Sequence, residues 1–369
     1  MSIEKYVSKA GKAGEVYYLQ HLHDCWNHPE YRRLNANEIL YTPSEHVKEA
    51  VIAMLDKLNY YPEDASTDTE FLGKLAAYVG LPGRADSVTI GNGSMEIIDM
   101  IYKTFVNEGD DILVAMPEYS PYARRAKMFL ANVVNVYPDD PDNFTYSAES
   151  YLSKVTPKTK LVIITRPNNP DGHMVSREMV EKVASSVDAM VVVDEAYYEF
   201  DKDPIEPYLD KYPNMIISHT FSKAMGLAAV RLGFAIASPE VIGYINQVRM
   251  PTNVNVLARA AAMALLDEPE VIEANAAKIR ADRQWLYDEI AKIPGLRPVE
   301  SHSNFVMIDC KNASKTATQI YEYLNSKGLR TRIFANSRGL EGDRYFRVTI
   351  GLHEDMEAVV REIRAFLGC

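Results

Sequence analysis

The central part of the chain alternates short apolar runs with longer amphipathic stretches. Helix-like segments such as Met95–Val106 and Arg177–Ser186 lie between several of these runs. Near-continuous apolar strands that alternate with helices are typical of a mostly parallel sheet covered on both faces. We therefore predict an α/β fold with strands at Val88–Ile90, Ile112–Ala115, Val133–Tyr137, Leu161–Thr165, Met190–Val193, Met215–Ser218 and Gly233–Ala237.

The pattern changes after Pro251. Two long segments with helical periodicity, Asn255–Leu266 and Pro269–Lys292, precede a smaller α+β unit. In that unit we predict strands at Phe305–Asp309, Leu329–Ile333 and Tyr345–Thr349 and helices at Ser314–Lys327 and Met356–Leu367. Because 369 residues are too many for one ordinary core, we expect a large domain over residues 44–251. Residues 1–43 and 252–369 would form a small domain.

Composition and charge exclude several classes of function. A chain that is 47% hydrophobic and 25% charged can bury a sizeable core. Its net charge of −11, with no concentrated basic patch, argues against a nucleic-acid partner. No run approaches the roughly 20 apolar residues of a membrane span, and no apolar core follows the N-terminal lysines as in a signal peptide. Three widely spaced cysteines fit free thiols, so we expect a cytoplasmic protein.

One glycine-rich turn has the features of a phosphate site. Gly91-Asn92-Gly93-Ser94 connects a predicted strand to a predicted helix. The first turn of a helix presents free backbone N–H groups and the positive end of its dipole, and both attract a phosphate. Ordinary turn preferences would also explain the same residues.

Polar residues follow the predicted strands at the edge where ligands bind in open α/β sheets. Asp194 follows strand Met190–Val193, and its carboxylate can pair with a cationic ring nitrogen or simply cap a helix. Lys223 follows strand Met215–Ser218; it can form a Schiff base if desolvated, although most lysines are solvated surface charges. Asn169 lies in a strong turn after strand Leu161–Thr165. Arg347 lies inside an apolar strand, where a guanidinium needs an anionic partner.

The order of these residues along one α/β chain carries a family resemblance. The phrases are GNGS, MPEYSPY, RPNNPDG, VVVDEAYYEF, HTFSKAMGLAAVRLGF and FRVTIG. With Leu34-Asn35-Ala36-Asn37-Glu38 and Tyr61-Pro62 they resemble the fold-type I, class I/II aminotransferases, and most closely the histidinol-phosphate aminotransferase group. The resemblance extends from about Leu34 to Leu367. It implies pyridoxal 5′-phosphate as cofactor and a homodimer with a shared active site.

The resemblance also implies roles for individual residues. Lys223 would form the aldimine with the cofactor and move the proton, Asp194 would hold the pyridinium nitrogen, and Tyr119 would stack on the ring. Asn169 and Tyr197 would form hydrogen bonds with the phenolic oxygen of the cofactor. The cofactor phosphate would be bound by Gly93, Ser94, Met95, Ser222 and Arg231, and across the dimer interface by Tyr61.

The resemblance also implies which residues would bind the substrate. Arg347 would bind the substrate α-carboxylate with help from Asn37 and Asn169, and Arg332 would contact a distal phosphate. Arg330 and Arg332 would point to the same face of one strand, either into the pocket or into solvent. The chain departs from the family pattern at Asn37-Glu38-Ile39-Leu40, at Met95 and at Ala229-Val230. The first of these departures lies near the substrate and affects its identity.

These residues predict transamination between an amino acid, or a phosphorylated amino alcohol of the histidinol-phosphate type, and a 2-oxo acid. Alternatives are another reaction on the same fold, such as a threonine-phosphate decarboxylase or an amino-acid cyclase, and a non-catalytic cofactor-binding protein. We expect no metal site. The candidate ligands His21, His23, Asp24, Cys25 and His28 match no standard zinc spacing.

Overall fold

A seven-stranded sheet forms the centre of the larger part of the molecule. The computed structural model describes residues 3–16, 25–64 and 67–369. The strand order is β2-β8-β7-β6-β5-β3-β4, with β8 antiparallel to both neighbours and the other pairs parallel. The strands are β2 Val88–Gly91, β3 Asp111–Ala115, β4 Asn132–Val136, β5 Thr159–Thr165, β6 Met190–Asp194, β7 Met215–Thr220 and β8 Gly233–Ala237.

Alternate residues of the central strands enter two different cores. Val191 and Val193 of β6 belong to one apolar cluster, whereas Val192 belongs to the other. Strands buried on both faces need apolar residues at every position, which explains the continuous runs in the sequence. The helices before and around this sheet are α1 Lys9–Ala13, α3 Glu45–Ile52, α4 Thr69–Tyr78, α5 Gly93–Phe105, α6 Pro121–Met128, α7 Ala148–Leu152, α8 Arg177–Ala184, α9 Pro239–Val248 and α10 Val256–Leu266.

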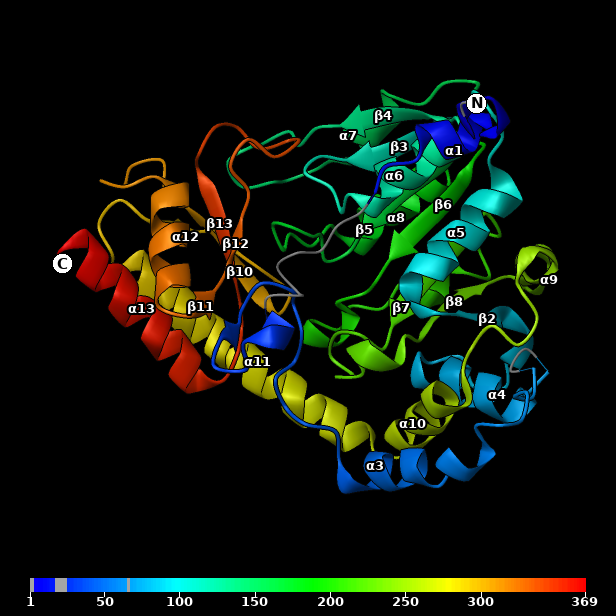
Figure 1. Ribbon diagram of the computed structural model, residues 1–369. Coiled ribbons are helices and arrows are strands. Elements are labelled where there is room, and N and C mark those ends of the chain that lie inside the picture. The colour runs from blue at the N-terminus through cyan, green and yellow to red at the C-terminus, as the bar shows by residue number, and fades with distance from the viewer. Residues whose placement is uncertain (1–2, 17–24, 65–66) are drawn as a thin grey trace.

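A smaller four-stranded sheet lies beside the large one, with order β12-β13-β10-β9. The long helix α11, Pro269–Ala291, runs from α10 to this smaller unit and lies along α13 (Figure 1). The remaining elements are β1 Arg32–Arg33, β9 Arg297–Pro298, β10 Phe305–Asp309, α12 Ala317–Ser326, β11 Leu329–Arg330, β12 Arg332–Ile333, β13 Tyr345–Thr349 and α13 His353–Leu367.

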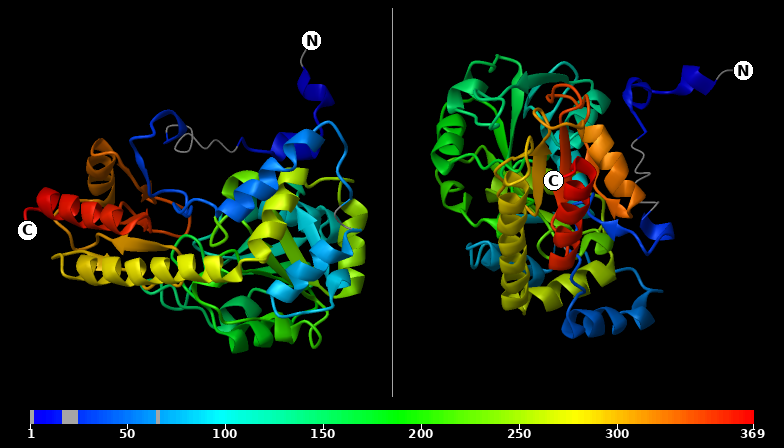
Figure 2. Two further views of the ribbon diagram at one scale, coloured as in Figure 1. Left: turned by 90° about the horizontal axis from the view of Figure 1, so that it is seen from below. Right: turned by 90° about the vertical axis from the view of Figure 1, so that its left-hand side faces the viewer.

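The N-terminal segment contacts both the larger and the smaller part of the molecule, and its strand β1 forms a separate two-stranded sheet with β11. The short 3₁₀ helix η1, Ile3–Tyr6, projects from the body of the molecule in both views of Figure 2. Glu15 forms an ion pair with Lys127 near α6, whereas β1 pairs with β11 of the smaller unit. The predicted domain boundaries at residues 43/44 and 251/252 stay a prediction.

The sequence pattern located most elements within three residues. All seven strands of the large sheet are confirmed, as is the mostly parallel α/β architecture. The single strand predicted at Leu329–Ile333 is wrong: β11 pairs with β1, whereas β12 pairs with β13. Thr331 separates them, and the side chains of Arg330 and Arg332 therefore have different surroundings. None of the helices in the described residues combines the length and apolar character needed to cross a membrane.

Candidate active site

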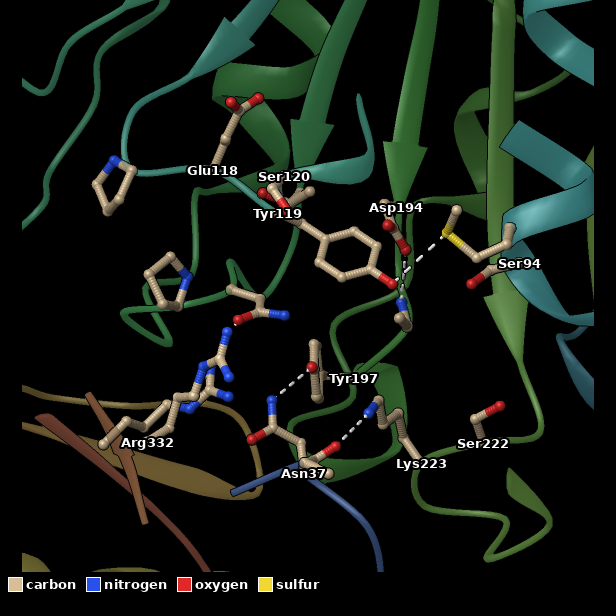
Figure 3. Close-up of a pocket in the computed structure, with 18 of the residues that line it drawn as sticks. Asn37, Ser94, Glu118, Tyr119, Ser120, Asp194, Tyr197, Ser222, Lys223 and Arg332 are labelled. Atoms are coloured by element: carbon tan, nitrogen blue, oxygen red, sulfur yellow. Dashed lines mark hydrogen bonds between the residues drawn. The ribbon is translucent and has the colours of Figure 1, made fainter. Parts of the chain in front are cut away.

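A cavity of about 570 Å³ lies where the parallel strands of the large sheet end. The smaller sheet closes its other side with β12 and β13. Figure 3 shows Ser94 and Ser222 at one end of the cavity, Arg332 at the opposite end, and Lys223, Tyr197 and Asn37 between them. Most of the predicted site residues line it: Asn37, Ser94, Met95, Tyr119, Asn169, Asp194, Tyr197, Ser222, Lys223, Arg231, Arg332 and Arg347.

Lys223 extends into the middle of this cavity. It follows β7 by three residues, so the strand fixes where its backbone leaves the sheet. Its Nζ donates a hydrogen bond to the Ala36 carbonyl at 3.0 Å and lies 5.7 Å from the centre of the Tyr197 ring. Burial, reinforced by Arg347 and Arg231, lowers the pKa of the amine to about 8. Above about pH 8 such a lysine is mostly a neutral, nucleophilic amine, a state that an ordinary lysine reaches only above its pKa near 10.5.

Asp194 ends β6 and is only 6% exposed. Its Oδ2 accepts a hydrogen bond from the Tyr122 hydroxyl at 2.5 Å, and its Oδ1 accepts one from the Ala196 N–H at 3.1 Å. Burial raises the pKa of this carboxyl against the opposing effect of these hydrogen bonds. A buried carboxyl that faces a cavity favours a cationic group beside it, because that group offsets the cost of desolvating the charge.

A chain of hydrogen bonds fixes Tyr197 beside Lys223. The Asn37 side chain donates from Nδ2 to the Tyr197 hydroxyl at 2.8 Å, and its Oδ1 accepts from Thr349 at 3.1 Å. Asn37 adopts a positive φ of 56°, a conformation that Asn tolerates better than most residues. Burial raises the pKa of Tyr197 to about 12, so its hydroxyl stays protonated and can donate a hydrogen bond.

The predicted phosphate turn has the required shape. Gly93 begins α5 with φ of 72°, and a Cβ there would lie 2.6 Å from Nη2 of Arg231. A Cβ on Gly233 would lie 2.5 Å from the Ser94 nitrogen. Arg231 also donates to Ser222 Oγ at 3.4 Å. Free N–H groups of a helix end, two hydroxyls and a guanidinium thus converge around a space that only glycines leave open, and this donor set fits a phosphate.

Two arginines face each other at the other end of the cavity. Arg332 of β12 and Arg347 of β13 are directly paired across the antiparallel strands, and both line the cavity. Arg347 donates from Nη1 to Asn169 Oδ1 at 2.5 Å, and its guanidinium lies 4.5 Å from the Phe305 ring centre. Planar carboxylates and phosphates match guanidinium groups in this setting.

Sequence reasoning missed several residues of the site. Tyr122 lies three residues after Tyr119 in the same MPEYSPY motif, and that position could have identified it. Ala36 acts through its carbonyl, which sequence does not signal. Glu118 is held by Arg338 at 2.8 Å, and burial raises the pKa of its carboxyl to about 7. Arg124, Lys127 and Arg338 add positive charge to the cavity wall.

One predicted cofactor contact, Tyr61, does not line the cavity. Tyr61 is 94% exposed and is not among the residues that line it. Of the candidate metal ligands that the sequence argued against, His21, His23 and Asp24 lie outside the described residues. Among the described residues, Cys25 and Cys310 are buried free thiols and Cys369 is an exposed one.

Comparison with known proteins identifies the family. The family model "Aminotransferase class I and II" matches residues 29–363. The chain belongs to the class I and II aminotransferases. Histidinol-phosphate aminotransferase of Methanosphaera stadtmanae is 31% identical over 333 residues, which are 90% of this chain and 89% of that protein. The enzyme of the same name from Methanothermobacter thermautotrophicus is 33% identical over 326 residues, 88% of this chain and 86% of its own length.

The fold of this aminotransferase agrees with that of solved relatives. Histidinol-phosphate aminotransferase from Sinorhizobium meliloti, in complex with pyridoxal-5′-phosphate, superimposes with a TM-score of 0.83 at 24% identity. The match covers 95% of this chain and 96% of that one. The chain is therefore a pyridoxal 5′-phosphate-dependent aminotransferase of fold type I. The phosphate cradle, the buried Asp194 and the desolvated Lys223 fit that cofactor.

Proposed function

We propose that this aminotransferase holds pyridoxal 5′-phosphate on Lys223 and uses substrates with an α-carboxylate, a distal phosphate or carboxylate, or both, which Arg347 and Arg332 would bind. The amino group would move between a 2-oxo acid and either an amino acid or a phosphorylated amino alcohol of the histidinol-phosphate type. The names of its relatives at 31–33% identity support this choice. A cytoplasmic location stays a prediction from the sequence.

Different residues of the cavity would have different roles in transamination. When bound, the cofactor supplies the electron sink that stabilises negative charge at the substrate α-carbon. Lys223 would take the proton from that carbon as a general base and deliver it to C4′ of the bound cofactor, and its pKa of about 8 lies closer to neutral pH than that of an ordinary lysine. Asp194 would keep the ring nitrogen protonated. Tyr197, held by Asn37, and Asn169 would donate hydrogen bonds to the ring oxygen, and Tyr119 would cover the ring face.

The observation that carries the substrate proposal is the cross-strand pair of Arg332 and Arg347. Like charges directly opposite each other on neighbouring strands repel. Both side chains nevertheless line the cavity, where an anionic substrate would reverse this cost. Arg347 would bind the substrate α-carboxylate, and Arg332 would bind a distal phosphate or carboxylate.

Arg332→Ala tests this proposal, and Arg330→Ala is its matched control. Arg330 lies on β11 with its guanidinium 4.5 Å from the Tyr31 ring, and it does not line the cavity. We expect Arg332→Ala to lower kcat/KM for phosphorylated and dicarboxylic substrates. The corresponding loss of transition-state binding free energy should be about 1.5–3 kcal/mol, the scale of a hydrogen bond to a charged group. Alanine as donor should be nearly unaffected, and Arg330→Ala should change neither. Equal losses for both substrate classes would assign Arg332 a structural role.

We also propose a homodimer in which Tyr61 completes the partner's phosphate site. The side chain is exposed and remote from its own cavity. Ile52, Leu55, Leu58 and Tyr60 are exposed on the same stretch of chain. An apolar group of this kind on one surface favours burial against a second protein.

A further inference from the structure

A second group of chemically active side chains lies buried beside the active site. Glu195 directly follows β6, Glu206 begins the 3₁₀ helix η5 (Glu206–Tyr208), and His219 lies in β7. They are 1%, 2% and 1% exposed. One oxygen or nitrogen from each residue comes within 4.8 Å of the other two. His219 Nε2 lies 3.4 Å from Glu206 Oε1 and 3.7 Å from Glu195 Oε2.

Within the described part of the chain, five of the six polar side-chain atoms of this cluster form no hydrogen bond, and the sixth, Glu195 Oε1, accepts one from Arg166. The five are Oε2 of Glu195, both carboxylate oxygens of Glu206 and both ring nitrogens of His219. Buried polar atoms without partners each cost roughly 1–3 kcal/mol, and charged ones cost more. Several such atoms aimed at one point indicate a bound species between them.

The charges around the cluster favour a cation. Arg166 is fully buried and donates from Nη1 to Glu195 Oε1 at 3.2 Å, but its Nη2 is bonded to Asp203. This guanidinium is thus divided between two carboxylates and leaves Glu206 without compensation. His219 packs between the Phe234 ring, stacked at 5.0 Å, and the edge of Tyr198 at 5.6 Å. The apolar contacts hold the imidazole so that Nε2 faces both carboxylates.

We infer that Glu195, Glu206 and His219 bind a divalent transition-metal ion, for which Zn²⁺ is the best match. Tetrahedral oxygen and nitrogen ligands at about 2.1 Å from zinc lie about 3.4 Å apart, close to the two distances observed. An imidazole among the ligands favours zinc-like ions over Mg²⁺ or Ca²⁺, which prefer oxygen alone. The ion's two positive charges would offset Glu206 and the part of the Glu195 charge that Arg166, shared with Asp203, leaves unbalanced.

The site has a structural role in this assignment. The ion would connect Glu195, which follows Asp194, to His219 in β7, the strand that leads to Lys223. Through Glu206 it would also hold the segment between β6 and β7. The Glu195 N–H also donates to the Ser218 carbonyl at 2.9 Å, so the backbone already joins the same two strands. The sequence gives no spacing motif for this site, because its ligands lie 11 and 13 residues apart on three different elements. The inference is independent of the substrate proposal.

Metal analysis of the holoenzyme tests the inference. The protein is produced in zinc-supplemented medium, dialysed against metal-free buffer and analysed by inductively coupled plasma mass spectrometry. We expect about one zinc per chain. Glu206→Gln and His219→Phe should each lose it, whereas Glu240→Gln, on the exposed start of α9, should retain it.

X-ray absorption at the zinc edge keeps the test decisive if a variant does not fold. The wild-type spectrum should show nitrogen and oxygen ligands without sulfur. Sulfur ligation would place the zinc on cysteine, and equal zinc in all variants would place it elsewhere; both results overturn the inference. A wild-type protein that contains less than about a tenth of an equivalent and takes up no added Zn²⁺ would also overturn it.

Discussion

Asp194 is surrounded by partners that fix its carboxylate but do not neutralise it. Tyr122 and the Ala196 N–H hold its two oxygens. We therefore expect Asp194→Ala to lower kcat by several orders of magnitude, because a charge-assisted contact to the ring nitrogen is lost. Tyr122→Phe keeps the charge and should cost no more than about tenfold, the scale of one hydrogen bond. Steady-state kinetics of both variants measure the difference. Near-normal activity in Asp194→Ala would mean that the ring nitrogen faces another group.

The depressed pKa of Lys223 predicts a pH dependence. An amine with a pKa of about 8 is mostly neutral above that pH, whereas an ordinary lysine with a pKa near 10.5 is not. The rate at which the apoprotein captures pyridoxal 5′-phosphate should thus rise with pH around a midpoint near 8. Stopped-flow absorbance measures this rate. A midpoint close to 10 would show that the lysine is solvated.

At the scale of elements, the contact between β8 and the first turn of α5 shapes the phosphate site. Gly233→Ala would place a Cβ 2.5 Å from the Ser94 nitrogen and 2.6 Å from the Gly93 carbonyl carbon. Overpacking of this kind typically costs about 1–3 kcal/mol. We expect a comparable loss in the free energy of unfolding and weaker cofactor binding, measured by denaturant titration and by cofactor release.

Gly243→Ala is the control for that substitution. Gly243 lies inside α9, and a Cβ there meets nothing within 4 Å. Alanine favours a helix interior over glycine, so this variant should be as stable as the parent or slightly more stable. If Gly233→Ala behaved in the same way, the turn would have room that the close contacts do not indicate.

The sequence predicted those elements whose identity depends on local pattern. The predicted bounds of strands such as Phe305–Asp309 and Gly233–Ala237 are correct to the residue, because an apolar run bounded by turn residues identifies a buried strand. The split at Thr331 was missed, because pairing with two different strands depends on tertiary contacts. The same reason hid the Ala36 carbonyl and the Glu195–Glu206–His219 cluster. Asp194 and Lys223 became candidates because both follow predicted strands that end at one edge of the sheet, and the family resemblance then assigned their roles.

At the scale of the whole molecule, the site depends on a second copy of the chain if Tyr61 acts as proposed. Sedimentation at assay concentration should show a dimer. Leu58→Glu should weaken the dimer and lower activity in parallel, since it puts a charge into the exposed apolar stretch. Tyr137→Glu alters another exposed aromatic residue, just beyond β4, and should leave both properties unchanged. An active monomer would refute the shared site.

The central claim is that Lys223 carries the cofactor. Borohydride reduction of the holoenzyme, followed by proteolysis and peptide mass analysis, tests it most directly. We expect a reduced pyridoxyl group on the peptide that contains Phe221-Ser222-Lys223 and on no other. Lys223→Ala should keep the fold and some non-covalent cofactor binding but show no label and no turnover. A pyridoxyl group on any other lysine would contradict the account.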